Sequence, residues 1–142
     1  MKKSDIRQNK IVEEFKILES DLEMSLNYLM EMGTKLDSMD NKHRKDENLV
    51  KDCQSKVWLL AKNSSKNVHF EGDSNTSITK GLLALLIRVF SNLSSKEIIE
   101  TKIFFPKRIG LDRFIGTQRS NGFASMEKKI KYLALTSVKT HE

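Results

Sequence analysis

The chain has 142 residues, of which 38% are hydrophobic and 31% are charged, values that suit one soluble domain with a single core. No apolar run approaches the roughly 18 residues of a membrane-spanning helix, so we expect no transmembrane helix. The net charge of +6 is unevenly placed, with −2 in residues 1–52 and +8 in residues 53–142. We therefore expect one domain over residues 1–142, with a basic carboxy-terminal part.

The basic part of the chain allows three interpretations. Its positive charges are spread singly and do not alternate with aromatic residues, which favours an ordinary solvated basic face. An acidic protein surface is the next candidate, and nucleic acid is the last. We therefore expect a protein partner and no nucleic acid.

Signals for secretion, metals and cofactors are missing from the sequence. Residues 6–15 are amphipathic and charged, unlike the apolar segment of a signal peptide, so we expect a cytoplasmic protein that does not bind a membrane. The single cysteine, Cys53, excludes an intrachain disulfide, and His43, His69 and His141 are too scattered for a zinc site. We expect neither a metal nor another cofactor.

Two helices are expected first along the chain. Ser4 or Asp5 can cap a helix that carries apolar residues at spacings near three to four over residues 6–18. Asp21 can cap a second helix, and Gly33 is well placed to end it.

A hairpin and a buried helix are expected in the middle of the chain. Residues 57–61 and 68–72 are strand candidates separated by a turn at residues 63–67. Residues 78–90 are apolar most of the way round, which predicts a helix buried against the sheet. Gly81, near the start of that helix, indicates close packing of its backbone against a neighbour.

The carboxy-terminal part adds a strand and a last helix. Residues 94–97 resemble a capping box, and residues 98–105 predict a third strand that Pro106 ends. Residues 116–122 have the composition of a loop, and residues 123–135 carry the pattern of a helix. The order of elements predicts an α+β fold, with helices packed against a small three-stranded antiparallel sheet.

Cys53 lies between a charged segment, residues 36–48, and the first strand. We predict that segment to be an extended surface loop. A lone cysteine is often a small buried hydrophobe without chemistry of its own. Lys51 and Lys56, however, make the surroundings polar and partly cationic, and such settings lower the pKa of a thiol below about 8.5. Trp58 is expected in the core.

Four fragments recur here in a specific order and spacing: Cys53–Trp58, Gly72–Ser74, Ile78–Leu82 and Arg119–Gly122. Together they resemble the SufE family of sulfur acceptors for cysteine desulfurases, over roughly residues 11–135. The resemblance implies a small antiparallel sheet covered by helices, an architecture shared with iron–sulfur scaffold proteins of the IscU type.

The resemblance also implies a function. Cys53 would accept persulfide sulfur from a pyridoxal-phosphate cysteine desulfurase of the SufS or CsdA kind, stimulate that enzyme, and pass the sulfur to a SufBCD-like scaffold for iron–sulfur cluster assembly. Two interpretations of Arg119 stay open: a stabiliser of the anionic states of Cys53, or an ordinary loop arginine. A homodimer is an open alternative. The residues expected at the partner surface are Lys51, Gln54, Ser55, Lys56, Asp73, Arg113 and Arg119.

Two stretches depart from the family pattern. The family continues Gly-Asp-Ser with Asp-Ala, where this chain has Asn75 and Thr76, and it usually places Leu-Ser/Thr-Pro-Ser where this chain has residues 115–118. Both departures concern partner docking. Two other functions are kept as alternatives: a basic nucleic-acid-binding module, and a redox protein whose single cysteine would need an external thiol.

Overall fold

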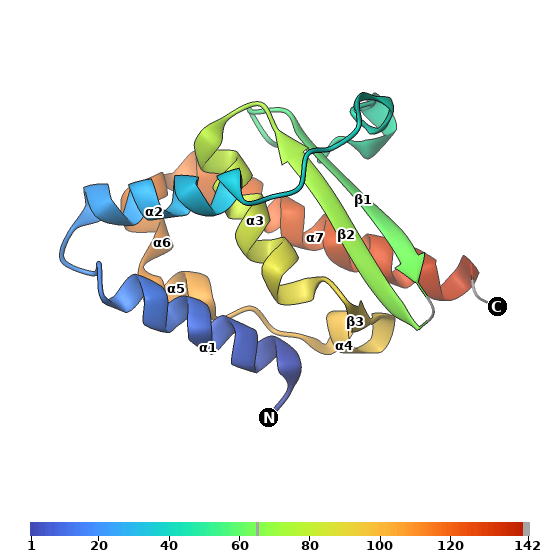
Figure 1. Cartoon of the computed structure of the whole chain (residues 1–142), viewed down its shortest axis with the longest axis horizontal. Helices are drawn as coiled ribbons and strands as arrows, with labels where there is room; N and C mark the ends of the chain where they lie inside the picture. Colours follow the sequence, from blue (N-terminus) through green and yellow to red (C-terminus); the bar gives the residue numbers. More distant parts are fainter. Residues whose placement is uncertain (65, 141–142) are drawn as a thin grey trace.

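The computed structural model describes residues 1–64 and 66–140, and Figure 1 shows how its elements follow one another. Within these residues the helices are α1 (Lys3–Lys16), α2 (Leu22–Thr34), α3 (Ser77–Phe90), α4 (Ser95–Glu100), α5 (Phe105–Ile109), α6 (Leu111–Ile115) and α7 (Thr117–Thr140). The strands are β1 (Val57–Ser64), β2 (Asn67–Ser74) and β3 (Leu93–Ser94), and two 3-10 turns are η1 (Asn41–His43) and η2 (Asp46–Asn48). Among the described helices none is long and apolar enough to cross a membrane.

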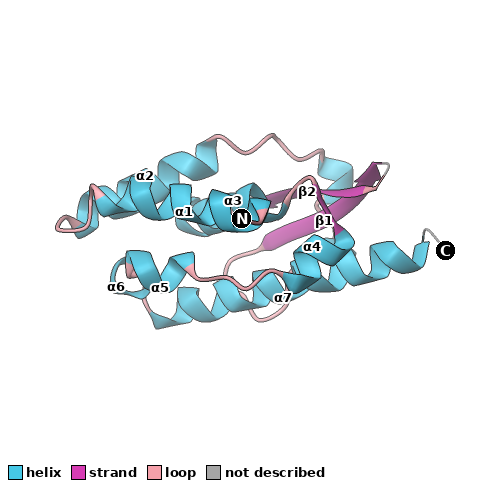
Figure 2. Cartoon of the chain, turned by 90° about the horizontal axis from the view of Figure 1, so that it is seen from below, coloured by secondary structure: helices cyan, strands magenta, loops and turns pink. Residues whose placement is uncertain are grey.

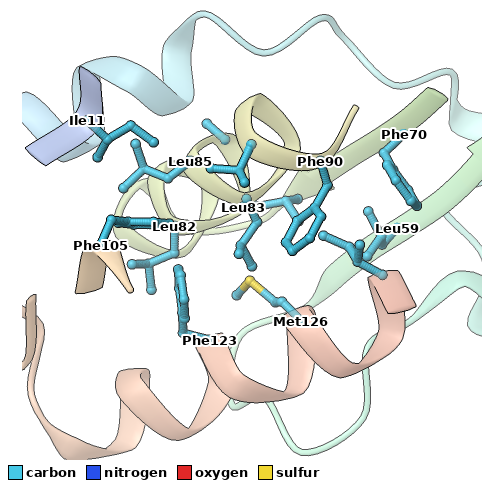
Figure 3. Packing of buried hydrophobic residues seen from close by; sticks show 14 of the residues in the cluster. Ile11, Leu59, Phe70, Leu82, Leu83, Leu85, Phe90, Phe105, Phe123 and Met126 are labelled. Atoms are coloured by element: carbon cyan, nitrogen blue, oxygen red, sulfur yellow. The ribbon is translucent and has the colours of Figure 1, made fainter. Parts of the chain in front are cut away.

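The three strands form one antiparallel sheet in the order β1-β2-β3. Figure 2 shows α1, α2 and α3 in one layer and α5, α6 and α7 in the other, with the β1–β2 hairpin at one end. Buried side chains meet between the layers, where Phe123 and Met126 of α7 face Leu82 and Leu83 of α3 (Figure 3). The predicted α+β fold with a three-stranded antiparallel sheet is therefore confirmed.

The two amino-terminal helices form as expected, but their ends differ in part. The side chain of Asp21 accepts the N–H of Met24 at 3.0 Å and caps α2, as predicted. Ser4 and Asp5 do not cap α1, because both lie inside that helix. Ser4 is buried, and its hydroxyl is 2.9 Å from that of Thr101. Its polar group serves a long-range contact instead of a cap.

Two glycines allow α2 and α3 to cross at backbone contact. A Cβ on Gly81 would stand 2.3 Å from the main-chain oxygen of Leu29, and one on Gly33 would stand 2.8 Å from the nitrogen of Gly81. The close packing predicted for Gly81 is confirmed. The prediction that Gly33 ends α2 is wrong, because the helix continues for another residue and the glycine faces α3.

The hairpin contains the two predicted strands, but the predicted position of one of its residues is wrong. Val57 and Leu59 of β1 are buried in the core, and α3 is buried along most of its length, as expected. Successive side chains of a strand point to opposite faces, so Trp58 lies on the other face of the sheet and is only half-buried. Its predicted place in the core is wrong. The predicted turn, residues 63–67, contains Ser65, which lies outside the described residues.

The segment 36–48 is anchored more firmly than a surface loop. It contains η1 and η2, and Met39 within it is buried, with 4% of its surface exposed. Arg44 reaches Asp73 of β2, with its Nη2 atom 2.7 Å from a carboxylate oxygen. The prediction of an extended loop is wrong, because one apolar side chain and one ion pair tie the segment down.

The carboxy-terminal part contains the largest differences from expectation. The capping box is confirmed, since Ser94 and Glu97 each accept the other's main-chain N–H. Residues 98–105 do not form the third strand; they complete α4 and lead to α5, while the short β3 precedes α4. Pro106 lies in the first turn of α5, where its missing N–H leaves no helical bond unmade. The predicted loop 116–122 is also wrong, because α7 begins at residue 117.

Candidate functional site

The cysteine loop, residues 51–56, is closed at its base by a hydrogen bond. The N–H of Val50 donates to the carbonyl oxygen of Val57 at 2.8 Å. Inside the loop Asp52 has a φ of +64°, a left-handed conformation that residues with a side chain seldom adopt. Cys53 follows directly, so the turn at Asp52 sets the direction in which its thiol leaves the backbone.

The segment between β2 and α3 holds the carboxyl end of the cysteine loop. The hydroxyl of Ser74 donates to the carbonyl of Lys56 at 2.8 Å, and the N–H of Lys56 donates to the side chain of Asn75 at 3.0 Å. The hydroxyls of Ser55 and Thr76 are 2.9 Å apart. Asn75 and Thr76, which depart from the family pattern, thus help to fix the loop.

One face of α7 closes the other side of the loop. Arg119, Gly122, Met126 and Lys129 recur at spacings of three, four and three, which places them on one side of a helix. The sulfur of Cys53 lies 3.6 Å from the carbonyl oxygen of Gly122. A Cβ on that glycine would stand 3.4 Å from the same sulfur. That separation is an ordinary van der Waals contact, so the thiol rests against the helix backbone without depending on the absence of a side chain at residue 122.

A cavity of about 110 Å³ opens beside the sulfur. Its walls come from the cysteine loop, α3 and the start of α7, and the lining residues are Cys53, Gln54, Ser55, Thr79, Leu82, Gln118, Arg119, Gly122 and Met126. A water molecule occupies about 30 Å³ of liquid, so the cavity has room for an additional sulfur atom.

The electrostatic surroundings of Cys53 favour the protonated thiol. Burial, and then the negative charge of Asp52, raise the pKa of the Cys53 thiol above its ordinary value. The prediction that Lys51 and Lys56 lower this pKa is therefore wrong for the free protein. Both lysines are exposed, whereas the sulfur is half-buried and directly follows a carboxylate.

The remaining residues predicted for the site fall into two groups around the loop. Gln54 and Arg119 line the cavity and are exposed, as is Lys56 next to it, while Ser55 is half-buried. The guanidinium of Arg119 donates to the carbonyl of Ile115 at 3.2 Å, and in the described part of the chain no bond joins it to Cys53.

Arg113 and Lys51 lie apart from the cavity. Arg113 is on α6, where its guanidinium lies over Gly110, and it does not line the cavity. Lys51 is at the opposite side of the cysteine loop, in a groove that also includes Lys129. The structure therefore brings Gln54, Ser55 and Arg119 together with the thiol, and leaves these two cations outside.

Asp73 is a buried ion-pair residue, with only 6% of its surface exposed. Its carboxylate contacts Arg44 at 2.7 Å and Lys80 at 3.3 Å. Burial raises the pKa of this carboxyl, but the hydrogen bonds from Arg44 and Ser74 and the charge of Lys80 outweigh burial and leave the pKa below its usual value. Such a residue fixes the segment before the cysteine loop and presents little surface to a partner.

Sequence reasoning did not assign Thr79, Leu82, Gly122 and Met126 to the site. They come from two helices that meet the cysteine loop only in the folded chain. A signal was present in the spacing of Gly122, Met126 and Lys129, which continues the face of Arg119. It was hidden because residues 116–122 have the composition of a loop.

Comparisons with known proteins identify the family of the chain. The family model for SufE, described as an Fe-S metabolism associated domain, matches residues 9–134. A SufE-like protein of Rhizobium etli is 34% identical over 128 residues, covering 87% of this chain and 86% of that protein. The cysteine desulfuration protein SufE of Wigglesworthia glossinidia brevipalpis is 36% identical over 107 residues, covering 73% of this chain and 74% of that protein.

The fold also resembles a solved structure. The solution structure of a hypothetical protein from Thermus thermophilus superposes with a TM-score of 0.77, covering 94% of this chain and 96% of that protein. At 18% sequence identity this likeness concerns the fold alone. Since the family model spans most of the residues and the relatives named above exceed 30% identity over more than two thirds of the chain, this protein belongs to the SufE family.

Proposed function

We propose that this protein is a sulfur acceptor that takes persulfide sulfur from a cysteine desulfurase onto Cys53, stimulates the desulfurase, and passes the sulfur on for iron–sulfur cluster assembly. The observation that carries the proposal is the single thiol, held at the mouth of a small cavity by a clamped loop. Family membership supports it, because a relative carries the name cysteine desulfuration protein.

The transfer step is a thiol exchange. Cys53 loses its proton to solvent, and its thiolate attacks the outer sulfur of the persulfide on the desulfurase. A sulfur–sulfur bond forms on Cys53 while the donor's sulfur–sulfur bond breaks, and the donor cysteine leaves as a thiolate. The number of electrons on the sulfur atoms is unchanged overall, so the step needs no oxidant or cofactor.

The geometry of the resting site supports a carrier rather than a free nucleophile. A raised pKa keeps Cys53 protonated at neutral pH, and thiols react through their thiolates, so the uncomplexed protein is protected from oxidation. Docking must therefore move the cysteine loop or its cover. The cavity beside the sulfur then offers a sheltered place for the outer sulfur after transfer.

The exposed polar residues around the cavity are the surface that we propose for the desulfurase. Gln54 and Arg119 line the cavity and Lys56 follows its lining residue Ser55, so two of these three residues are cationic. An acidic rim on the desulfurase would complement them and accelerate association. A SufBCD-like scaffold would have to reach the same cysteine later, so the two partners would bind in turn.

The decisive experiment is mass spectrometry after incubation with a cysteine desulfurase and free cysteine. We expect Cys53 to gain about 32 Da, the mass of one sulfur atom, and a reductant to remove it. The Cys53→Ser variant, which has no other thiol, is the matched control and should gain nothing. An unchanged mass in the presence of an active desulfurase that binds the protein would overturn the proposal.

A further inference from the structure

Lys129 makes an unusual contact at the start of the cysteine loop. Its Nζ atom donates to the carbonyl oxygen of Leu49 at 2.9 Å and lies 3.4 Å from that of Glu47. Across the described residues Lys129 forms no salt bridge to a carboxylate. The ammonium therefore holds a stretch of main chain rather than an acidic side chain.

The hydrogen bonds of Lys129 form in a half-buried setting. A charged donor to a carbonyl oxygen forms a stronger hydrogen bond than a neutral one, more so where water is partly excluded. Burial, and then the charge of Lys51, lower the pKa of Lys129, so both disfavour its ammonium. Leu49 immediately precedes Val50, whose N–H closes the base of the cysteine loop. The lysine therefore holds the residue next to this closing bond.

The same helix face links Lys129 to the thiol. Lys129 lies seven residues after Gly122, two helical turns along α7, and Met126 lies between them. The carbonyl of Gly122 accepts the hydrogen bond of the Cys53 thiol. Lys129 donates to the carbonyl of Leu49, which belongs to the stem of the loop, residues 47–50. A groove of about 790 Å³ between the stem and α7 leaves space beside these contacts. Moving the stem away from α7 breaks the bonds to Lys129.

We propose that Lys129 is a positioning residue that latches the stem of the cysteine loop, residues 47–50, to α7, and so sets how readily Cys53 is exposed. The latch acts on the free protein. Its consequence for sulfur transfer rests on the function proposed above: a weaker latch makes opening less costly, so a desulfurase reaches Cys53 at a lower protein concentration.

The test compares three substitutions at neighbouring lysines. Lys129→Met removes the donors and keeps the length of the side chain, and Lys129→Arg restores donors. Lys128→Met makes the same change in charge at an exposed neighbour that forms no bond to the stem within the described residues. Cys53 is labelled with a bulky maleimide across pH 6–10, and hydrogen exchange is followed at residues 47–53.

At pH 7 Lys129→Met should raise the labelling rate about tenfold, the effect expected for losing a charge-assisted hydrogen bond. Lys129→Arg and Lys128→Met should label like the wild type. A labelling rate at pH 7 that is unchanged in Lys129→Met, or raised equally in Lys128→Met, would overturn the latch.

Two further measurements separate the latch from a fold defect and from the proposed function. The melting temperature of Lys129→Met is recorded first, and Lys129→Gln, a milder change, replaces it if the variant does not fold. Labelling and hydrogen exchange need no desulfurase, so they report on the latch even if Cys53 accepts no sulfur. With a desulfurase present, Lys129→Met should lower the concentration for half-maximal stimulation and leave the maximum unchanged.

Discussion

The sulfur of Cys53 lies 3.6 Å from the main-chain oxygen of Gly122, so the reactive thiol of the loop rests on the backbone of α7. A carbonyl oxygen accepts a hydrogen bond from a thiol but repels a thiolate. This contact therefore favours the same protonated state as the burial of the sulfur and the charge of Asp52. On the function proposed above, separation of the loop from α7 would remove these effects and make the thiolate easier to form.

Asp52→Asn should lower the pKa of Cys53, because the carboxylate is the second cause of its elevation. The pKa should stay above the value of a free thiol, since burial is the larger cause and remains. We expect alkylation at pH 7 to become faster, and the difference from the wild type to shrink in high salt, which screens an exposed charge. The pH midpoint of alkylation measures the pKa of Cys53. An identical midpoint in both proteins would show that Asp52 does not raise this pKa.

Arg119→Ala should leave the alkylation midpoint of the free protein where it is, because the guanidinium is bonded to Ile115 rather than to the thiol. Sulfur transfer at saturating desulfurase should nevertheless slow about tenfold, the scale of one charge-assisted hydrogen bond. This expectation rests on the proposed function: the cation of Arg119 on the cavity wall would stabilise an anionic persulfide on Cys53. Single-turnover transfer decides the matter: a defect that disappears at saturation would show that Arg119 only contributes to docking.

Lys56→Glu should weaken stimulation of the desulfurase without unfolding the chain. The side chain is exposed, and the bonds that hold this residue use its main chain. Rim charges act mostly on association rate, so the defect should be largest at low salt and fade as salt rises. Lys62→Glu is not a clean control, because Lys62 pairs with Glu71; Lys96→Glu, exposed at the other end of the fold, is preferred.

Asp73→Asn should lower the free energy of unfolding at pH 7 by on the order of 2–3 kcal/mol, since Arg44 and Lys80 lose a buried charged partner. The folded-state pKa of Asp73 is depressed, so its contribution is complete above the ordinary value of 3.8 and is lost as pH falls below it. Denaturant titrations should show that the difference in unfolding free energy between Asp73→Asn and the wild type becomes smaller in acid. Asp37→Asn, at an exposed site, should show no comparable gap.

Gly81→Ala should destabilise the protein by about 2 kcal/mol or more, because the new methyl would stand 2.3 Å from a backbone oxygen of α2 that cannot rotate away. Thermal unfolding measures the loss. Ser77→Ala, an exposed position at the start of the same helix, is the comparison and should change little. Equal melting temperatures for the two variants would contradict the close crossing of α2 and α3.

The parts of the fold that followed from sequence are those with local causes. Asp21 caps its own helix, residues 78–90 are apolar enough to be buried in any packing, and Ser94 and Glu97 cap one another. Trp58 shows the limit: its burial depends on which face of the sheet the helices cover, and no pattern in a strand that is apolar on both faces decides that.

The site was predictable to the same extent. Cys53 is unique, and the fragments around it carry the family resemblance, but the pKa of its thiol depends on how deeply the loop settles against α7. The start of α7 was missed because glycine, serine and asparagine favour turns when taken alone. Tertiary contacts override this preference: Gly116, with a φ of +85°, breaks the chain direction, and the helix resumes at the next residue.

Gln8 has a consequence for how this chain is made. Its buried amide donates to the carbonyl of Lys102 and accepts hydrogen bonds from the N–H groups of Phe104 and Phe105. These bonds join α1 to residues almost a hundred positions later in the chain. On a ribosome the first helix emerges long before these partners exist. Until then α1 can contact α3, which is made earlier, but the amide of Gln8 lacks these partners, and contacts this distant in sequence form slowly. The docking of α1 can therefore be completed only after α4 has been synthesised.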